Sequence, residues 1–234
     1  MTPARTPRMS VPAVEPRVER WRSTTPEDLV GALLGGVPPR VGRPAVLAVD
    51  GRSGAGKSTV AARLAAALPR AAVVSTDDVA WHEPLFGWAG LLREGVLRPA
   101  RDGRSVRFVP PAWASRGRAG AIEVPAGLDL LVVEGTGSGQ AALSDLLDAV
   151  VWVQSDEHEA KARGLARDVA SGVNGGEAAA EEFWAGWMAH EDPFFEADRP
   201  WSRADAILAG TRPAAGPADP LLVDAQRAGG GPRG

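Results

Sequence analysis

A glycine-rich segment early in the chain has the clearest chemical pattern. It reads Gly51-Arg52-Ser53-Gly54-Ala55-Gly56-Lys57-Ser58 and fits the phosphate-loop pattern G-x-x-x-x-G-K-[ST] throughout. Glycines let successive backbone N–H groups point at phosphate oxygens, and the start of the following helix adds free N–H groups and the positive end of its dipole. In this pattern the lysine reaches the β- and γ-phosphates, and the hydroxyl after it binds Mg²⁺. The predicted nucleotide ligands are therefore Gly51, Arg52, Ser53, Gly54, Ala55, Gly56, Lys57, Ser58 and Thr59, with Lys57 also catalytic and Ser58 also a metal ligand.

Two acidic segments follow apolar runs that read as buried strands. Glu134 closes the run at 128–134 and is placed to hold Mg²⁺, directly or through water. Asp77 and Asp78 follow the run at 71–75, where a carboxylate could accept a proton from an acceptor hydroxyl. We assign the catalytic role to Asp77 and an acceptor contact to Asp78, and the reverse assignment stays open. The alternatives are an exposed acid at a strand end for Glu134 and loop caps for the two aspartates.

Arg163 and Arg167 lie four residues apart in a predicted helix and therefore share one of its faces. Two cations on one face could clamp a phosphoryl group during transfer. Glycine-rich sequence follows them, so we expect a lid at about 157–180 that moves on a hinge. The alternative is an ordinary solvated helix face. Further along, Phe183, Trp184, Trp187 and Met188 have helical spacing and predict core packing.

The longest stretch between predicted strands, residues 80–127, combines aromatic residues with arginines. Long segments in compact domains are usually functional, and aromatic rings with arginines could hold a base and a phosphate. Trp81, Arg107 and Trp113 are, with Asp78, the predicted acceptor contacts. A small local core with a basic surface would give the same composition.

These residues need elements that bring them together. Apolar runs at 45–50, 71–75, 128–134 and 149–153, with a weaker one at 206–209, predict five strands buried on both faces. Thr25-Pro26-Glu27-Asp28 has the residue types of a helix start, and residues 59–68 predict the helix after the phosphate loop. Alternating buried strands and helices predict an α/β fold, a three-layer α/β/α phosphate-loop NTPase with a five-stranded parallel sheet.

Length and composition bound the rest. The chain has 234 residues, 44% of them hydrophobic, with a formal net charge of −3 and no cysteine. This is the composition of one globular domain, which we place at residues 25–211, between a disordered Pro/Arg-rich arm at 1–24 and a disordered tail at 212–234. The absence of cysteine excludes thiol catalysis and Cys-ligated metals. Net charge gives no support to nucleic-acid binding, and no apolar run is long enough to span a membrane, so we expect a cytoplasmic protein. The sequence leaves open whether the protein forms a homo-oligomer.

With these motifs in order, the chain resembles the uridine kinase family within the nucleoside and nucleotide kinases. The resemblance covers about residues 44–211 and rests on VLAVDGRSGAGKST, VVSTDDVAW, LLVVEG, ARGLARD and RADAILAG. It implies a kinase-like fold, with Asp77 at the catalytic-aspartate position and Arg163 and Arg167 in the lid helix. It also implies ATP and Mg²⁺ as cofactors and transfer of the γ-phosphate to a nucleoside, a nucleotide or a related hydroxyl metabolite. The family's Pro-x-Tyr-Asp acceptor motif appears here only as Pro111-Ala112-Trp113-Ala114.

Two other functions fit a phosphate loop in a chain of this length. One is a non-kinase ATPase that uses hydrolysis as a switch or motor; no N-K-x-D motif for guanine is present, and the chain is short for a motor. The other is an ATP-binding regulatory protein. An acceptor-dependent ADP release assay separates the three functions.

Overall fold

The computed structural model describes residues 9–35, 42–172, 175–210 and 219–227. Its centre is a seven-stranded sheet with strand order β1-β9-β8-β7-β2-β6-β3. The strands are β1 (Trp21–Thr24), β2 (Ala45–Gly51), β3 (Ala71–Ser75), β6 (Leu130–Glu134), β7 (Ala149–Gln154), β8 (Ala206–Ala209) and β9 (Leu221–Asp224). A separate hairpin pairs β4 (Val106–Phe108) with β5 (Ile122–Val124).

The five strands predicted from the apolar runs form the parallel part of the sheet. β3, β6, β2, β7 and β8 are neighbours in that order, and each adjacent pair is parallel. Glu134 is in register with Val49 on one side and with Ser75 on the other. Because parallel strands end at the same edge of a sheet, the segments that follow β2, β3 and β6 start side by side.

The sheet has seven strands instead of the predicted five, because two further strands extend it beyond β8. β9 pairs antiparallel with β8 and with β1, so that Trp21 lies opposite Asp224. β1 and β9 lie inside the stretches predicted to be a disordered arm and a disordered tail. That prediction is wrong for both strands, and also for the described segment before β1, in which Glu15 is buried. Each strand is only four residues long, and the two strands pair with each other across about 200 residues of sequence. Residues 1–8, 212–218 and 228–234 of the predicted arm and tail lie outside the described residues.

Alternate residues of the central strands face two separate cores, as expected for a sheet covered on both sides. On one face, Leu47 and Val49 of β2 pack with Leu29 of α1 (Pro26–Leu34) and Leu64 of α2 (Lys57–Ala66). On the other face the core contains strand residues together with residues from the 80–127 insertion and from α8 (Glu177–Asp198). At α1, the Thr25 hydroxyl accepts a hydrogen bond from Asp28 N–H, which confirms the predicted helix start.

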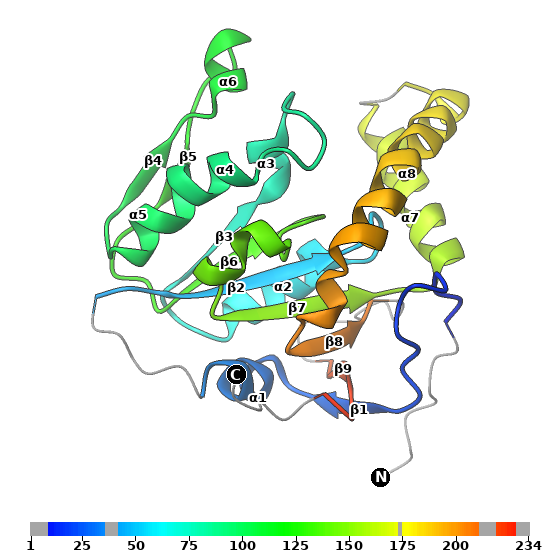
Figure 1. Cartoon of the computed structure of the whole chain (residues 1–234), viewed down its shortest axis with the longest axis horizontal. Helices are drawn as coiled ribbons and strands as arrows, with labels where there is room; N and C mark the ends of the chain where they lie inside the picture. Colours follow the sequence, from blue (N-terminus) through cyan, green and yellow to red (C-terminus); the bar gives the residue numbers. More distant parts are fainter. Residues whose placement is uncertain (1–8, 36–41, 173–174, 211–218, 228–234) are drawn as a thin grey trace.

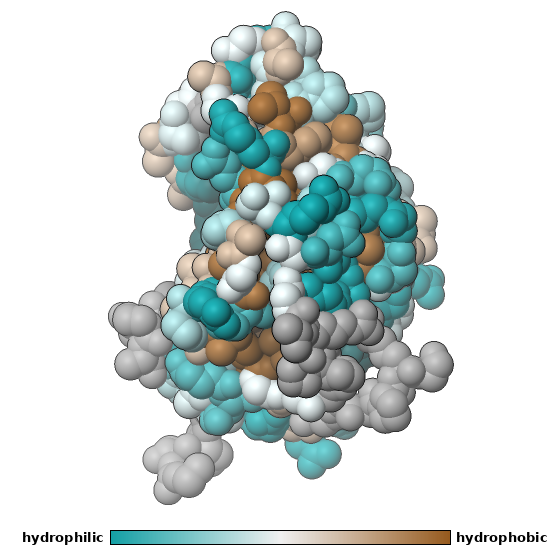
Figure 2. All heavy atoms as spheres, turned by 90° about the vertical axis from the view of Figure 1, so that its left-hand side faces the viewer, coloured by the Kyte–Doolittle hydropathy of each residue, from teal (hydrophilic) through white to brown (hydrophobic). Residues whose placement is uncertain are grey.

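The segment after β3 forms a lobe that projects from the sheet (Figure 1). Its elements are α3 (Thr76–Ala80), α4 (Ala89–Leu92), the π-helical turn η1 (Arg93–Leu97), α5 (Arg98–Arg101), the β4–β5 hairpin and α6 (Pro111–Ser115) between the hairpin strands. Figure 2 views the molecule from the side of this lobe and shows hydrophobic atoms in patches among hydrophilic ones. Trp88, Leu92, Trp113 and Val124 of the lobe are all buried, and they continue the core on this face of the sheet into the lobe.

Two antiparallel helices, α7 (Glu157–Ser171) and α8, lie across from the lobe, at the right of Figure 1. α7 is capped by Asp156, whose carboxylate accepts hydrogen bonds from the N–H groups of His158 and Glu159. The predicted lid at 157–180 covers α7 and only the start of α8, since α8 continues to Asp198. The remaining short helical turns are η2 (Ala141–Leu146) and η3 (Pro200–Ser202).

Candidate active site

The glycine-rich segment forms the connection between β2 and α2. β2 ends at Gly51, and α2 begins at Lys57. Gly54 and Gly56 have positive φ angles of 73° and 94°, a backbone conformation that glycine adopts without strain. A side chain at Gly54 would also overlap the carbonyl oxygen of Ala160 in α7. The loop therefore needs glycine at this position for two reasons, its own conformation and the close approach of α7.

Lys57 lies almost buried beneath this loop. Its ammonium group donates hydrogen bonds to the carbonyl oxygen of Arg52, at 2.8 Å, and to the hydroxyl of Thr136, at 3.1 Å. Burial lowers the pKa of Lys57, while Glu191, Asp50, Glu134 and Asp77 act in the opposite direction, in that order. The charges of carboxylates from four different segments therefore act on the ammonium group.

The two predicted metal ligands are neighbours. The hydroxyl of Ser58 donates a hydrogen bond of 3.1 Å to a carboxylate oxygen of Glu134, and both residues lie at the carboxyl end of the parallel strands. A hydroxyl and a carboxylate suit Mg²⁺, which typically takes one or two protein ligands and completes its shell with water and phosphate oxygens. The described residues contain no group of three or more His, Cys, Asp or Glu side chains that could hold a metal by themselves. The Ser58–Glu134 pair fits an ion that is brought by a nucleotide.

Asp50 is an important residue here that was not predicted from the sequence. Asp50 is fully buried and accepts three backbone hydrogen bonds, from Gly51 at 2.7 Å, Gly137 at 2.8 Å and Gly139 at 2.9 Å. It thereby ties the start of the phosphate loop to the loop after β6, which contains Thr136. Burial raises the pKa of Asp50 to about 6, and the three N–H groups partly offset that rise. The only sequence signal was an acid at the end of an otherwise apolar strand.

The predicted catalytic Asp77 lies at the start of α3, directly after β3. The Ser75 hydroxyl caps this helix by accepting a hydrogen bond of 3.3 Å from the Asp77 N–H. The Asp77 side chain is exposed, and its charge acts on Lys57. The structure therefore brings Asp77 to the side of the loop where Lys57, Ser58 and Glu134 meet.

Asp78 belongs to a different cluster, on the lobe. Its carboxylate pairs with Arg118 at 2.5 Å, and its carbonyl oxygen accepts a hydrogen bond of 2.8 Å from the indole of Trp113. The Arg118 guanidinium lies 3.5 Å from the ring centre of Trp113 and 5.2 Å from that of Trp81. Three of the four predicted acceptor contacts thus come together around Arg118, a residue that the sequence did not single out.

Arg107, the fourth predicted acceptor contact, is not part of that cluster. It lies on β4 and forms an ion pair across the hairpin with Glu123 of β5, and both side chains are exposed. This cross-strand pair stabilises the hairpin locally.

The two arginines of the predicted clamp contact different parts of the molecule. Arg163 donates to the carbonyl oxygen of Gly210 at 2.8 Å and to the hydroxyl of Ser155 at 3.0 Å. Ser155 in turn donates to the carbonyl oxygen of Ala55, so Arg163 is one hydrogen bond away from the phosphate loop. Arg167 instead pairs with its neighbour Asp168 at 2.9 Å and is largely exposed. α7 therefore presents one arginine, not two, to the segments around the loop.

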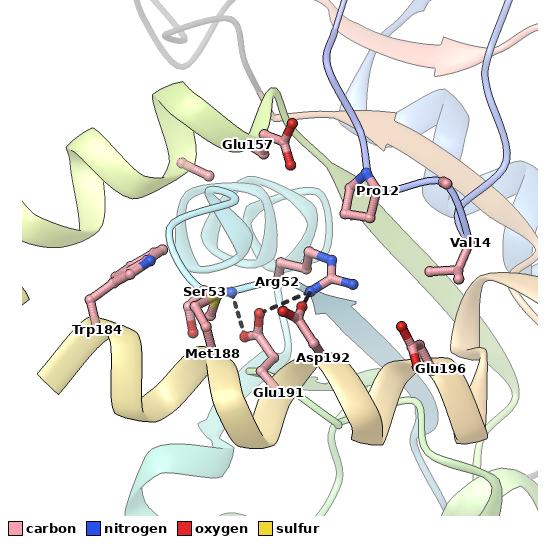
Figure 3. Close-up of a pocket in the computed structure, with 12 residues that line it drawn as sticks. Pro12, Val14, Arg52, Ser53, Glu157, Trp184, Met188, Glu191, Asp192 and Glu196 are labelled. Atoms are coloured by element: carbon pink, nitrogen blue, oxygen red, sulfur yellow. Dashed lines mark hydrogen bonds and ion pairs between the residues drawn. The ribbon is translucent and has the colours of Figure 1, made fainter. Parts of the chain in front are cut away.

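Arg52 is the loop residue with the most side-chain partners. Its guanidinium pairs with Glu15 at 2.6 Å, Asp192 at 2.5 Å and Glu191 at 3.4 Å. Glu15 belongs to the N-terminal segment and also accepts hydrogen bonds from the side chains of Trp152 and Gln154 on β7. A pocket of about 310 Å³ lies beside Arg52, between the N-terminal segment, α7 and α8 (Figure 3). Its lining is Pro12, Ala13, Val14, Arg52, Ser53, Glu157, Ala160, Trp184, Met188, Glu191, Asp192 and Glu196.

α8 contributes more to this site than the core packing predicted for it. Trp184 is buried, but Phe183 is half exposed. Trp187 donates a hydrogen bond to Glu191 from its indole, and Met188 lines the pocket. One face of α8 therefore lies against the phosphate loop.

Comparison with known proteins places the fold in a class. No protein-family model and no curated protein matches the sequence. Among solved structures, a "putative fructose transport system kinase from Silicibacter sp. TM1040" is 24% identical, with a TM-score of 0.56 over 75% of this chain and 96% of that one. The YGR205w protein is 14% identical, with a TM-score of 0.52 over 80% of this chain and 94% of that one.

A "Possible Uridine Kinase from Bacillus stearothermophilus" also matches, at 17% identity and a TM-score of 0.47, over 77% of this chain and 97% of that one. The chain has the fold of the phosphate-loop kinases, with a mostly parallel α/β sheet whose strand number is seven instead of the predicted five. Within the described residues, no helix combines the length and the apolar character that crossing a membrane requires.

Proposed function

We propose that this protein is a kinase that transfers the γ-phosphate of ATP to a hydroxyl group of a small metabolite, such as a nucleoside or nucleotide. The observation that carries the proposal is the meeting of Lys57, the Ser58–Glu134 pair and Asp77 at the ends of three adjacent strands. A cation, a metal-binding pair and a separate carboxylate are the three groups that phosphoryl transfer to a hydroxyl requires.

Each residue has a role in this proposal. The backbone N–H groups of residues 51–59 bind the phosphates, and Lys57 neutralises charge on the β- and γ-phosphates. Ser58 and Glu134 hold Mg²⁺, which when bound draws charge from the phosphate oxygens. Asp77 orients the acceptor hydroxyl and accepts its proton while the oxygen bonds to the γ-phosphorus and the bond to ADP breaks. Arg163 stabilises the segments around the loop, and Arg167 would need to turn inward to take part.

The lobe that follows β3, which contains the 80–127 insertion, is the proposed acceptor side. The cluster of Asp78, Arg118, Trp81 and Trp113 offers aromatic faces and a guanidinium for a planar or anionic group of the acceptor. Because the donor is ATP, the proposal also implies a cytoplasmic location. Association into a homo-oligomer is compatible with it.

A screen of hydroxyl metabolites with labelled ATP tests the proposal. The expected result is transfer of label to at least one metabolite, with ADP release that depends on that metabolite. ADP release at the same rate without any acceptor would instead support an ATPase. Nucleotide binding without turnover would support a regulatory protein, and no nucleotide binding would contradict the phosphate-loop assignment.

A further inference from the structure

A carboxylate of α8 accepts a hydrogen bond from one of the backbone amides of the phosphate loop. Glu191 is fully buried, and one of its carboxylate oxygens accepts a hydrogen bond of 2.8 Å from the Ser53 N–H. The same oxygen accepts a hydrogen bond of 3.0 Å from the indole of Trp187, and the other lies 3.4 Å from the Arg52 guanidinium. Figure 3 shows Glu191 pointing from α8 towards Ser53 and Arg52. This contact joins two segments about 140 residues apart in the sequence.

The charge of Glu191 also reaches the centre of the site. Of the carboxylates that counteract the burial of Lys57, Glu191 has the largest effect, ahead of Asp50, Glu134 and Asp77. An anionic oxygen that accepts a hydrogen bond from a loop amide and whose charge acts on Lys57 resembles a phosphate oxygen in both of its interactions. A bound phosphate chain and the Glu191 carboxylate would therefore both interact with the loop around the Ser53 amide and with Lys57. Because both are negatively charged, they would repel each other.

Arg52 compensates for this charge only in part. Its single guanidinium is shared by Glu15, Glu191 and Asp192, so three carboxylates surround one cation at the start of the loop. Asp192 is about half exposed and is screened by water, whereas Glu15 and Glu191 are buried. Excess negative charge at the buried side of the loop therefore comes mainly from the two glutamates.

We propose that Glu191 is a positioning residue that sets the affinity of the loop for phosphate chains according to their charge. Its carboxylate holds Ser53 and Arg52 in place, and its charge opposes the terminal phosphate of a nucleotide. A metal ion on the phosphates weakens that repulsion, so Glu191 makes binding of the metal-free triphosphate less favourable than binding of the metal complex. The proposal rests on the proposed function only in that the loop binds ATP, and it requires no turnover.

Titration calorimetry of the full chain with ATP and ADP, each with and without Mg²⁺, tests the proposal. Glu191→Gln keeps an oxygen that can accept the Ser53 hydrogen bond but removes the charge. Its expected effect is about tenfold tighter binding of metal-free ATP, a smaller gain for metal-free ADP and the smallest gain for the Mg²⁺ complexes. Asp192→Asn is the matched control, because this neighbouring carboxylate also contacts Arg52 but is exposed; its expected effect is less than about twofold.

The outcomes separate the two proposals. If the wild-type chain binds neither nucleotide, the proposed function is wrong. If it binds them and folded Glu191→Gln binds ATP equally well or more weakly, or gains equally for ATP and ADP, the role of Glu191 is wrong. Thermal unfolding checks that the variant is folded. If it is not, Glu15→Gln removes the other buried charge on Arg52 and must give the same order of gains, or the proposal is contradicted.

Discussion

The phosphate loop and the acceptor-side lobe differ in how their residues come together. The loop is one uninterrupted segment of eight residues between a strand and a helix. The cluster on the lobe joins Asp78 and Trp81 to Trp113 and Arg118, about 40 residues away. A site built from one segment is set by local backbone conformation, whereas a site built from several segments depends on how a whole lobe packs. Substitutions in the two regions should therefore separate donor binding from acceptor choice.

The largest effect is expected at the junction of the two regions. Asp77→Asn keeps the shape of the side chain and removes the base, so kcat should fall by roughly 10²–10⁴-fold while ATP affinity stays within a few-fold of wild type. Steady-state kinetics with the identified acceptor and direct ATP binding measure the two quantities. Asp78→Asn is the control and should do much less. A severe loss in Asp78→Asn with a mild one in Asp77→Asn would reverse the two roles.

Lys57→Ala tests the donor side alone. Removing a cation that meets the phosphates should raise the barrier by about 3 kcal/mol, or roughly 150-fold in kcat/KM for ATP. ATP titration and ADP release at saturating Mg²⁺ are the measurements, with circular dichroism to check the fold. Wild-type turnover in this variant would contradict the phosphate-loop mechanism.

Asp50 allows a test of the connection between the loop and the segment after β6. Because its pKa rises from 3.8 to about 6 on folding, the native state holds the proton more tightly than the unfolded chain. The resulting stabilisation is complete below pH 4 and is lost as the pH rises through 6, by about 3 kcal/mol in total. Urea unfolding of wild type and Asp50→Asn from pH 4 to 7 measures it. The wild-type free energy of unfolding should fall relative to the variant, and a constant difference would rule out the raised pKa.

The smallest effect is expected on the lobe. Arg118→Gln removes the cation between Trp81 and Trp113 and should raise the KM for the acceptor about tenfold, with the KM for ATP unchanged. Arg107→Gln is a matched control, because Arg107 forms an ion pair with exposed Glu123 on the hairpin, outside the Arg118 cluster. It should leave both constants unchanged. A change in the KM for ATP but not for the acceptor would move Arg118 to the donor side.

The same contrast explains how much the sequence could predict. The five parallel strands, the loop and the Ser58–Glu134 pair were predictable, because apolar runs and a contiguous motif carry them. Glu191 was not, because α8 reads as an ordinary amphipathic helix and its contact with Ser53 exists only after folding. The insertion contains several arginines, and the sequence does not show which of them lies between the two tryptophans. Arg107 was therefore predicted as an acceptor contact, whereas Arg118 forms the cluster and Arg107 forms a local ion pair. β1 and β9 were missed because each is only four residues long and lies in a stretch rich in Pro, Arg or Gly.

The pairing of β1 with β9 has a consequence for biosynthesis. β1, which contains Trp21, can pair with β9 only after Asp224 has been synthesised, about 200 residues later. At a translation rate of about 5–20 residues per second, this delay is roughly 10–40 s. During that time the ribosome has already released the phosphate loop and its parallel strands, which can fold among themselves. The segment with Glu15 is thus made before the phosphate loop, but its strand can join the sheet only after β9 has been made.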